Sequence, residues 1–183
     1  MSEFFEKINN ILDSGSKQEK IKILESLNDA RDPKIINKII SMLDDPEIEV
    51  RGEAFSVLVL NENNISEFLI NNLTSDSKNV RAFSSLVLAN RKNSDAISAI
   101  MNLTNDSSSM VRSCALGALG YLKAVQASKV IHNCLLDNNL EVKKSALKAV
   151  IDIGDKIPQK EIKKIAKEKD EELEKLLLLA KQN

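Results

Sequence analysis

The apolar positions of this chain follow a pattern that returns about every 31 residues. In most copies, one apolar residue is followed by others four and eight positions later, as at Val111, Ala115 and Leu119. This spacing places all three side chains on one face of an α-helix and does not fit a strand. The copies begin at Val50, Val80, Val111 and Val142, which are 30, 31 and 31 positions apart.

A second apolar segment precedes each of these helices. The clearest is PKIINKIISML, in residues 33–43, where Ile36, Ile39, Ile40 and Leu43 again have helical spacing. Polar turns such as DDPE and TNDSSS separate the two segments of a copy, and their side chains can accept the free backbone N–H groups at the start of the second helix. Each copy is therefore predicted to be a pair of helices.

Steps of 31 residues outward from these copies reach Glu19 and Leu173, where the pattern is weaker but present. One helical pair cannot bury its apolar face alone, so stacked pairs share a core and the end pairs act as caps. We therefore predict an all-α chain, a right-handed α-solenoid (α-α superhelix) of about six two-helix repeats, forming a single domain over residues 1–183. The predicted repeats are 2–29, 33–61, 64–91, 94–122, 125–154 and 158–182, the first and last being capping repeats.

The unit Leu-x6-Val-Arg-x2-Ala-x3-Leu, with Asp in the turn, resembles the armadillo-like HEAT repeat. Its short period resembles the bilin-lyase-type (phycobilisome lyase) subclass. The clearest copies begin at Val50-Arg51, Val80-Arg81 and Val111-Arg112, and the resemblance covers roughly residues 2–182. The resemblance implies that the second helices line the concave face and that the chain binds other proteins. Such an implication rests on fold analogy.

A basic residue occupies the position after the anchor in five repeats. These residues are Lys20, Arg51, Arg81, Arg112 and Lys143. One interpretation is a basic stripe that binds phosphate or an acidic peptide; the other is structural, with each cation bridging turn carboxylates. The resembled family implies the second, an inter-repeat ladder. We predict a structural ladder of Arg51, Arg81, Arg112 and Lys143 with Asp45, Asp76, Asp106 and Asp137.

Positions two, six and nine after each anchor point away from the core on a helical wheel. The predicted concave, partner-binding residues are Gly52, Ser56, Val59, Ala82, Leu86, Ala89, Ser113, Gly117, Gly120, Lys144, Lys148 and Ile151. This face is small and mildly apolar until the fifth repeat, although solvated helix faces are normally charged. It predicts a groove for a partner helix or extended peptide. Tight curvature of the solenoid and self-association are the alternatives.

No aromatic residue lies on those positions. Phe83 is expected at the edge of the core, and Tyr121 is expected to be a packing residue. His132 is the only histidine, so we expect a surface or boundary residue rather than a metal ligand, because metal sites need several ligands. Cys114 and Cys134 are expected to be buried small hydrophobes, with a thiol pair as the alternative.

Composition narrows the class of partner. The net charge of −1 gives no global field to attract nucleic acid or an acidic membrane. No apolar run approaches the roughly 20 residues that cross a bilayer. The N-terminal MSEFFEKINNILDSG lacks the apolar core of a signal peptide, so we expect a cytoplasmic protein, and the many Lys, Ile and Asn residues suggest a microbial source.

Candidate chemistry is sparse. The sequence has no phosphate-cradling glycine loop and no Ser-His-Asp set that spacing supports. We therefore predict no enzyme, no metal and no cofactor. The predicted function is a protein–protein interaction scaffold that binds a peptide or helix on its concave face, as a monomer or weak homo-oligomer. The alternatives are an enzyme or enzyme subunit of the bilin-lyase type and a HEAT domain that regulates a partner enzyme.

Overall fold

The computed structural model describes residues 3–180, and in this range it contains helices and loops but no strand, which confirms the all-α prediction. The α-helices are α1 (Glu3–Ser14), α2 (Lys17–Glu25), α3 (Pro33–Ser41), α4 (Ile48–Leu60), α5 (Ser66–Asn71), α6 (Lys78–Asn90), α7 (Ile97–Asn102), α8 (Ser109–Tyr121), α9 (Ser128–Cys134), α10 (Leu140–Asp152), α11 (Gln159–Ile165) and α12 (Glu171–Ala180). The predicted outer ends of the terminal repeats, at residues 2 and 181–182, lie outside the described residues.

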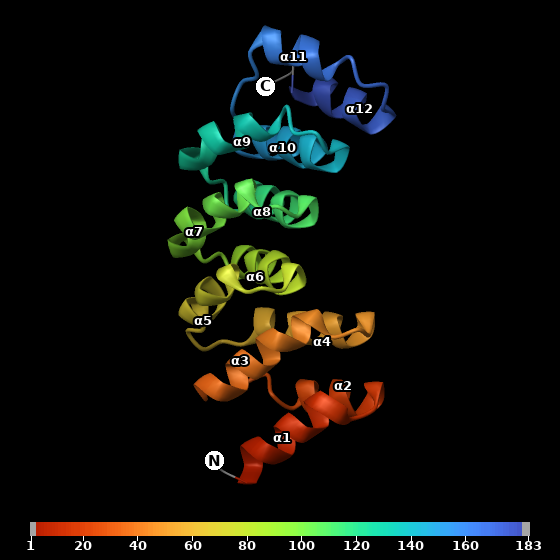
Figure 1. The fold of residues 1–183 in the computed structure, drawn as a ribbon. Helices are drawn as coiled ribbons and strands as arrows, with labels where there is room; N and C mark the ends of the chain where they lie inside the picture. Colours follow the sequence, from red (N-terminus) through yellow and green to blue (C-terminus); the bar gives the residue numbers. More distant parts are fainter. Residues whose placement is uncertain (1–2, 181–183) are drawn as a thin grey trace. The chain divides into compact units, whose positions relative to one another are not determined.

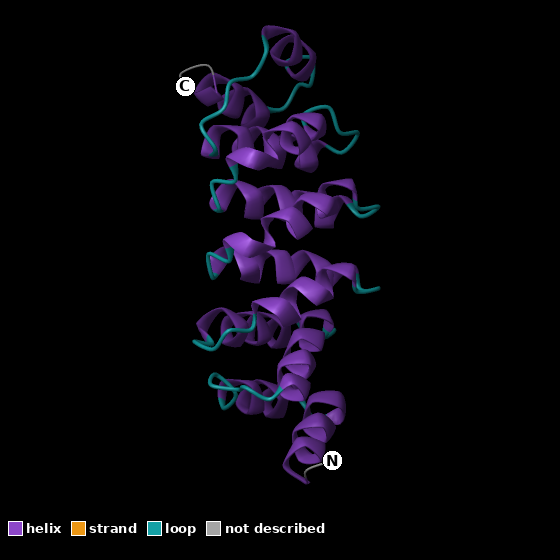
Figure 2. Cartoon of the chain, turned by 90° about the vertical axis from the view of Figure 1, so that its left-hand side faces the viewer, coloured by secondary structure: helices purple, strands orange, loops and turns teal. Residues whose placement is uncertain are grey.

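The chain divides into two compact units, Met1–Arg91 and Lys92–Asn183. In unit 1, the second helices α2, α4 and α6 pack in succession, and the first helices α1, α3 and α5 form the other row (Figure 1). In unit 2, α8 packs on α10 and α10 packs on α12. Helices alternate with short loops throughout the described chain (Figure 2). Whether all 183 residues form one domain stays a prediction.

The predicted apolar stripe forms the core of both units. In α4, Val50, Ala54 and Leu58 are each at most 1% exposed. The corresponding positions of the later second helices are also buried: Val80, Ser84 and Leu88; Val111, Ala115 and Leu119; Val142, Ala146 and Val150. The four-residue spacing thus places these side chains against the neighbouring helices, as the pattern predicts.

Polar side chains of the turns cap α6 and α10 as expected, whereas α4 and α8 have no side-chain cap. The side chain of Asn139 accepts hydrogen bonds from the backbone N–H groups of Glu141 and Val142, and Ser77 does the same for Val80. In α2, Glu19 interrupts the apolar stripe. It forms a capping box in which its carboxylate accepts a hydrogen bond from the backbone N–H of Ser16 at 2.8 Å. Glu19 therefore stabilises the N-terminus of α2.

The first helices are less regular than the sequence suggests. Segments of 3-10 helix extend several of them: η1 (Met42–Asp44), η2 (Asn72–Thr74), η3 (Ser94–Ala96), η4 (Leu103–Asn105) and η5 (Val125–Ala127). As a result α5 and α7 have only six α-helical residues each. The segments η1, η2 and η4 lead from a first helix into the turn that starts the next second helix, whereas η3 and η5 come directly before α7 and α9.

The C-terminal end of α4 is held by an arginine that the sequence pattern did not single out. The guanidinium of Arg91 donates to the backbone carbonyls of Leu58 at 3.0 Å and Asn63 at 2.7 Å, and also to that of Asn61. The carbonyl of Leu58 lies in the last turn of α4, where carbonyls have no partner inside the helix, and those of Asn61 and Asn63 lie in the loop that follows. Burial lowers the pKa of Arg91 below its usual range.

Candidate partner-binding surface

An apolar hollow lies on the second helices of unit 1, with a volume of about 360 Å³. We refer to this depression as the unit 1 hollow. Its lining residues are Ile48, Arg51, Gly52 and Phe55 on α4, and Phe83 and Leu86 on α6. Two of the predicted concave residues, Gly52 and Leu86, therefore lie in the same depression.

Aromatic side chains contribute to this hollow, although none of the twelve predicted concave positions carries one. Phe55 and Phe83 are half-buried, and Ile48 is 69% exposed. Phe83 was expected only at the edge of the core. Gly52 leaves room between these side chains, because a Cβ built there meets nothing within 4 Å. The hollow thus exists because a small residue is surrounded by large ones.

A second hollow of about 530 Å³ lies on the second helices of unit 2 and is more polar; it is named the unit 2 hollow. Its lining residues are Gly117, Tyr121, Lys123, Ser145, Lys148, Ala149 and Asp152. Tyr121 is 55% exposed, which contradicts the prediction of a packing residue. Lys123 closes one side through a 2.7 Å hydrogen bond to the backbone carbonyl of Asp152.

Nine of the twelve predicted concave residues are at least partly exposed: Gly52, Ser56, Val59, Leu86, Ser113, Gly117, Lys144, Lys148 and Ile151. Ala82, Ala89 and Gly120 are buried, so they are not available to a partner. A Cβ at Gly120 would lie 3.0 Å from Asp152 Oδ2 and 3.1 Å from Ala149 Cα. Gly120 therefore permits close packing of α8 on α10 rather than close approach of a ligand.

Lys144 is partly exposed but is already engaged. Its ammonium lies 3.2 Å from a carboxylate oxygen of Glu141, 3.2 Å from Asp170 and 3.0 Å from Glu172. Hydrogen bonding to Glu172, and then to Asp170 and Glu141, raises the pKa of Lys144 above its usual range. This side chain links α10 to α12, which limits what it can offer to a partner.

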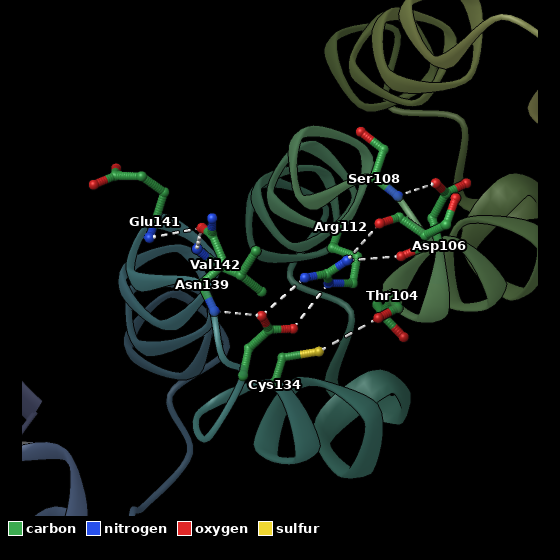
Figure 3. Close-up of polar contacts among 10 residues, drawn as sticks. Thr104, Asp106, Ser108, Arg112, Cys134, Asn139, Glu141 and Val142 are labelled. Atoms are coloured by element: carbon green, nitrogen blue, oxygen red, sulfur yellow. Dashed lines mark hydrogen bonds and ion pairs between the residues drawn. The ribbon is translucent and has the colours of Figure 1, made fainter.

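The basic position after the anchor forms a well-defined contact in unit 2 (Figure 3). Nε and Nη2 of Arg112 donate to the two carboxylate oxygens of Asp137 at 2.8 and 2.9 Å. Its Nη1 donates to the carbonyls of Asp106 and Ser107 at 2.8 and 3.2 Å. One guanidinium thus joins the turn of its own repeat to the turn of the next.

Other members of this column have related contacts. Lys20 bonds the buried carboxylate of Asp45 at 2.8 Å, and Lys143 bonds Glu168. Nη1 of Arg51 and Nη1 of Arg81 each donate to two carbonyls of the preceding turn, at Asp45 and Pro46 and at Ser75 and Asp76 respectively. That these contacts set the register between repeats stays a prediction.

His132 lies between two carboxylates of unit 2. Its Nε2 is 3.3 Å from Asp155 and its Nδ1 is 3.2 Å from Glu161. Among residues 3–180, no cluster of three or more His, Cys, Asp or Glu side chains has a geometry that could hold a metal ion. These contacts link α9 to the loop and helix of the following repeat.

The cysteines are free thiols: Cys134 is buried and Cys114 is partly so. Burial, assisted by Asp137, raises the pKa of Cys134 to about 11, against a smaller opposing effect of Arg112. Burial also raises the pKa of Cys114. Such thiols are weak nucleophiles, because the thiolate is the reactive form.

None of the described helices combines the length and the apolar character needed to cross a membrane. No curated protein sequence matches the chain. Residues 66–151 match the family model described as HEAT repeats, so the HEAT resemblance is confirmed.

Solved structures with the same fold match 82% or more of the chain. A designed armadillo repeat protein in complex with the peptide (KR)4 is 19% identical, with 99% of each chain covered and a TM-score of 0.58. The complex of CpcE and CpcF of phycocyanin lyase from Nostoc sp. is 19% identical, covers 82% of this chain and 99% of that chain, and has a TM-score of 0.68. At these identities the likeness establishes the α-solenoid class, not the activity.

Proposed function

We propose that this chain, which carries HEAT repeats, is a non-catalytic scaffold that binds a peptide or helix of another protein on the face of its second helices. The unit 1 hollow carries this proposal. It is open, apolar and flanked by Phe55 and Phe83. Aromatic and aliphatic side chains around a depression are typical of the buried centres of protein interfaces.

The glycines of the second helices support the same function. Gly52 and Gly117 lie inside helices, where glycine is about 1 kcal/mol less favourable than alanine. A Cβ at either position meets nothing within 4 Å, so packing inside the chain does not require glycine there. Each lines one of the two hollows. Keeping a surface open for a ligand is a reason to retain them.

Catalysis has less support. Active sites combine a deep pocket with convergent polar groups. The unit 1 hollow has one charged lining residue, Arg51, among apolar neighbours. In the unit 2 hollow, Lys123 and Asp152 are already bonded to each other.

The test is affinity capture with wild-type chain and with the double variant Leu86→Glu, Gly117→Glu. Both positions lie on the second-helix face; Leu86 is partly exposed, and a Cβ at Gly117 meets nothing within 4 Å. A matched control carries Asn71→Glu and Lys129→Glu on the exposed surface of the first helices α5 and α9. We expect a partner that the wild type and the control retain and the double variant loses, with unchanged circular dichroism. Equal capture by all three proteins would contradict the proposal.

A subunit of a lyase is the second candidate, and the likeness to CpcE and CpcF of phycocyanin lyase supports it. Mixing the chain with a free bilin separates the two functions. A scaffold leaves the visible absorbance spectrum of the bilin unchanged. A shifted absorbance band that depends on Lys148 or Tyr121 in the unit 2 hollow would favour the lyase candidate instead.

A further inference from the structure

We propose that the unit 1 hollow recognises an acidic peptide in which a bulky apolar side chain enters the space above Gly52 and an adjacent carboxylate binds the guanidinium of Arg51. This inference rests on the proposed scaffold function and specifies its ligand. It follows from a difference between two arginines at the same repeat position.

Arg51 and Arg112 are held in the same way at the start of their helices. In each, Nη1 donates to two carbonyls of the preceding turn: Asp45 and Pro46 for Arg51, at 2.7 and 3.0 Å, and Asp106 and Ser107 for Arg112. This contact fixes the plane of the guanidinium. The orientation of the remaining donors is therefore set before any ligand arrives.

The remaining donors are used in one case and open in the other. Nε and Nη2 of Arg112 bind both oxygens of Asp137. Within residues 3–180, Nε and Nη2 of Arg51 have no acceptor, and no carboxylate lies within ion-pair distance of its guanidinium. Asp76, which stands 25 positions after Arg51 as Asp137 does after Arg112, is exposed and does not pair with it. Arg51 thus presents a preset, bidentate carboxylate-binding edge.

The Arg51 side chain borders the hollow. Arg51 lines it together with Ile48, Phe55, Phe83 and Leu86. A ligand whose carboxylate reaches Arg51 therefore places its neighbouring side chain among aromatic and aliphatic groups. An apolar side chain buries surface there, whereas a charged one would lose hydration without a partner.

The acidic residues of α4 lie on its other side, toward α2. Glu49 pairs with Lys17 of α2 at 2.8 Å. Burial, with a contribution from Glu25 of α2, raises the pKa of Glu53. The side of α4 that faces α6 carries the cation instead. The hollow therefore favours an anionic ligand over a cationic one.

The matching positions of unit 2 lack both the apolar lining and the open guanidinium edge of the unit 1 hollow. Ser145 and Lys148 occupy in α10 the places, three and six after the anchor, that Phe83 and Leu86 occupy in α6. Arg112 is already paired with Asp137. A peptide that places an apolar side chain next to a carboxylate is consequently expected to bind unit 1 and not unit 2.

Fluorescence anisotropy with the full chain and labelled peptides tests this recognition. The probe is a flexible peptide with a central Leu-Phe-Asp-Asp sequence. Its matched controls replace both Asp by Asn, replace Leu and Phe by Ser, or replace both Asp by Lys. We expect the probe to bind, both the Asn and the Ser peptides to bind about 3- to 10-fold more weakly, and added salt to weaken only the Asp-containing peptides.

Variants of the chain identify the contacts. Arg51→Gln is expected to weaken the probe to the level of the Asn peptide, and Arg51→Glu to prefer the Lys peptide. Gly52→Leu fills the apolar space and is expected to weaken the binding of both the probe and the Lys peptide. Lys129→Gln on the exposed surface of the first helix α9 is the control and leaves binding unchanged. Circular dichroism and thermal unfolding show which variants are folded, and Phe83→Ser provides a second test that leaves Arg51 in place.

The outcomes distinguish the two proposals. If the Asn peptide binds as well as the Asp probe, or the Lys129→Gln and Arg51→Gln variants behave alike, the carboxylate assignment is wrong. If no peptide binds but the Leu86→Glu, Gly117→Glu variant still loses its captured partner, the ligand class is wrong and the scaffold function stands. If capture is also unaffected, both proposals fail.

Discussion

The guanidinium of Arg112 shows how one side chain connects two repeats. It uses two donors for a carboxylate and a third for backbone carbonyls, and both side chains of the ion pair are at most 14% exposed. Asp137 in turn accepts the backbone N–H of Asn139 at 2.8 Å. Removing the arginine would leave a carboxylate with little access to water, which is where the loss of a charged partner is most destabilising.

Replacing Arg112 by leucine should lower the free energy of unfolding by about 2–3 kcal/mol, because it removes a largely buried ion pair and two carbonyl bonds. The matched variant Arg51→Leu removes only carbonyl bonds and should lower it by about 1 kcal/mol. Urea unfolding at pH 7 measures both. Equal losses would show that the pair with Asp137 contributes nothing of its own.

The contribution of this pair should depend on pH. Burial alone would raise the pKa of Asp137, but hydrogen bonds from Arg112 and Asn139 outweigh it and hold that pKa below its usual 3.8. A carboxyl whose pKa is lower in the folded state stabilises the fold above its unfolded pKa, and that stabilisation disappears as the pH falls through the folded value. The difference in unfolding free energy between wild type and Arg112→Leu should therefore be constant near neutral pH and shrink below about pH 4. A difference that stays the same in acid would argue against the pair.

The thiols should be unreactive in the folded chain. With the pKa of Cys134 at about 11, little of it is thiolate at mildly alkaline pH, and its Sγ points to the carbonyl of Thr104 (Figure 3). A colorimetric disulfide reagent should modify both cysteines slowly in buffer and rapidly in denaturant. Rapid modification of the folded chain would mean that α9 opens easily.

Some of the residue roles could be predicted from the sequence and others could not. The core positions of Val50, Ala54 and Leu58 follow from spacing alone, because periodicity fixes which face is buried. The hollow does not follow, since it depends on Gly52 of one helix facing Phe83 of the next. A helical wheel of one helix contains no information about which residues of the neighbouring helix lie opposite it.

At the scale of helices, the glycines separate two roles that look identical in the sequence. Gly52 and Gly120 both lie in second helices. A Cβ on Gly52 meets open space, whereas one on Gly120 would lie 3.1 Å from the Cα of Ala149 in α10. Gly120 is therefore needed where two helices approach closely, and Gly52 is not needed for the fold.

Alanine substitution should consequently act in opposite directions. Gly52→Ala should raise the free energy of unfolding by about 0.5–1 kcal/mol, because alanine restricts the unfolded chain and favours the helix. Gly120→Ala should lower it, because α10 must shift to accept the methyl group. Urea unfolding of the two variants gives the sign of each effect. The same sign for both would contradict the packing difference.

Helix type was easier to predict than helix shape. The second helices α4, α6, α8 and α10 each contain 13 residues and begin two residues before the anchor, as the pattern places them. The 3-10 segments of the first helices were not predictable, because residues at i and i+3 also share a face in an α-helix. Of these segments, η1, η2 and η4 pack against the second helices α4, α6 and α8 that follow them.

At the scale of the whole molecule, a stack of repeats draws its stability from neighbouring pairs of repeats. Lys144 is one such link, since it bonds carboxylates of Glu141, Asp170 and Glu172 and joins α10 to α12. Replacing Lys144 by glutamine should speed amide hydrogen exchange in α12 more than in α4 of unit 1. Unchanged exchange in α12 would show that its apolar contacts at Leu173 and Leu177 suffice.

The prediction of a single domain over residues 1–183 can be tested through the same coupling. If the repeats unfold as one cooperative domain, Arg112→Leu, which lies in unit 2, should lower the protection of the slowest amides in α4 and in α10 by the same factor. If the two units unfold independently, only α10 should lose protection. Hydrogen exchange followed by mass spectrometry resolves the two helices. We expect the common loss, because continuous apolar spacing across the repeats is what the periodic sequence encodes, and exchange that changes in unit 2 alone would replace the one-domain prediction with two.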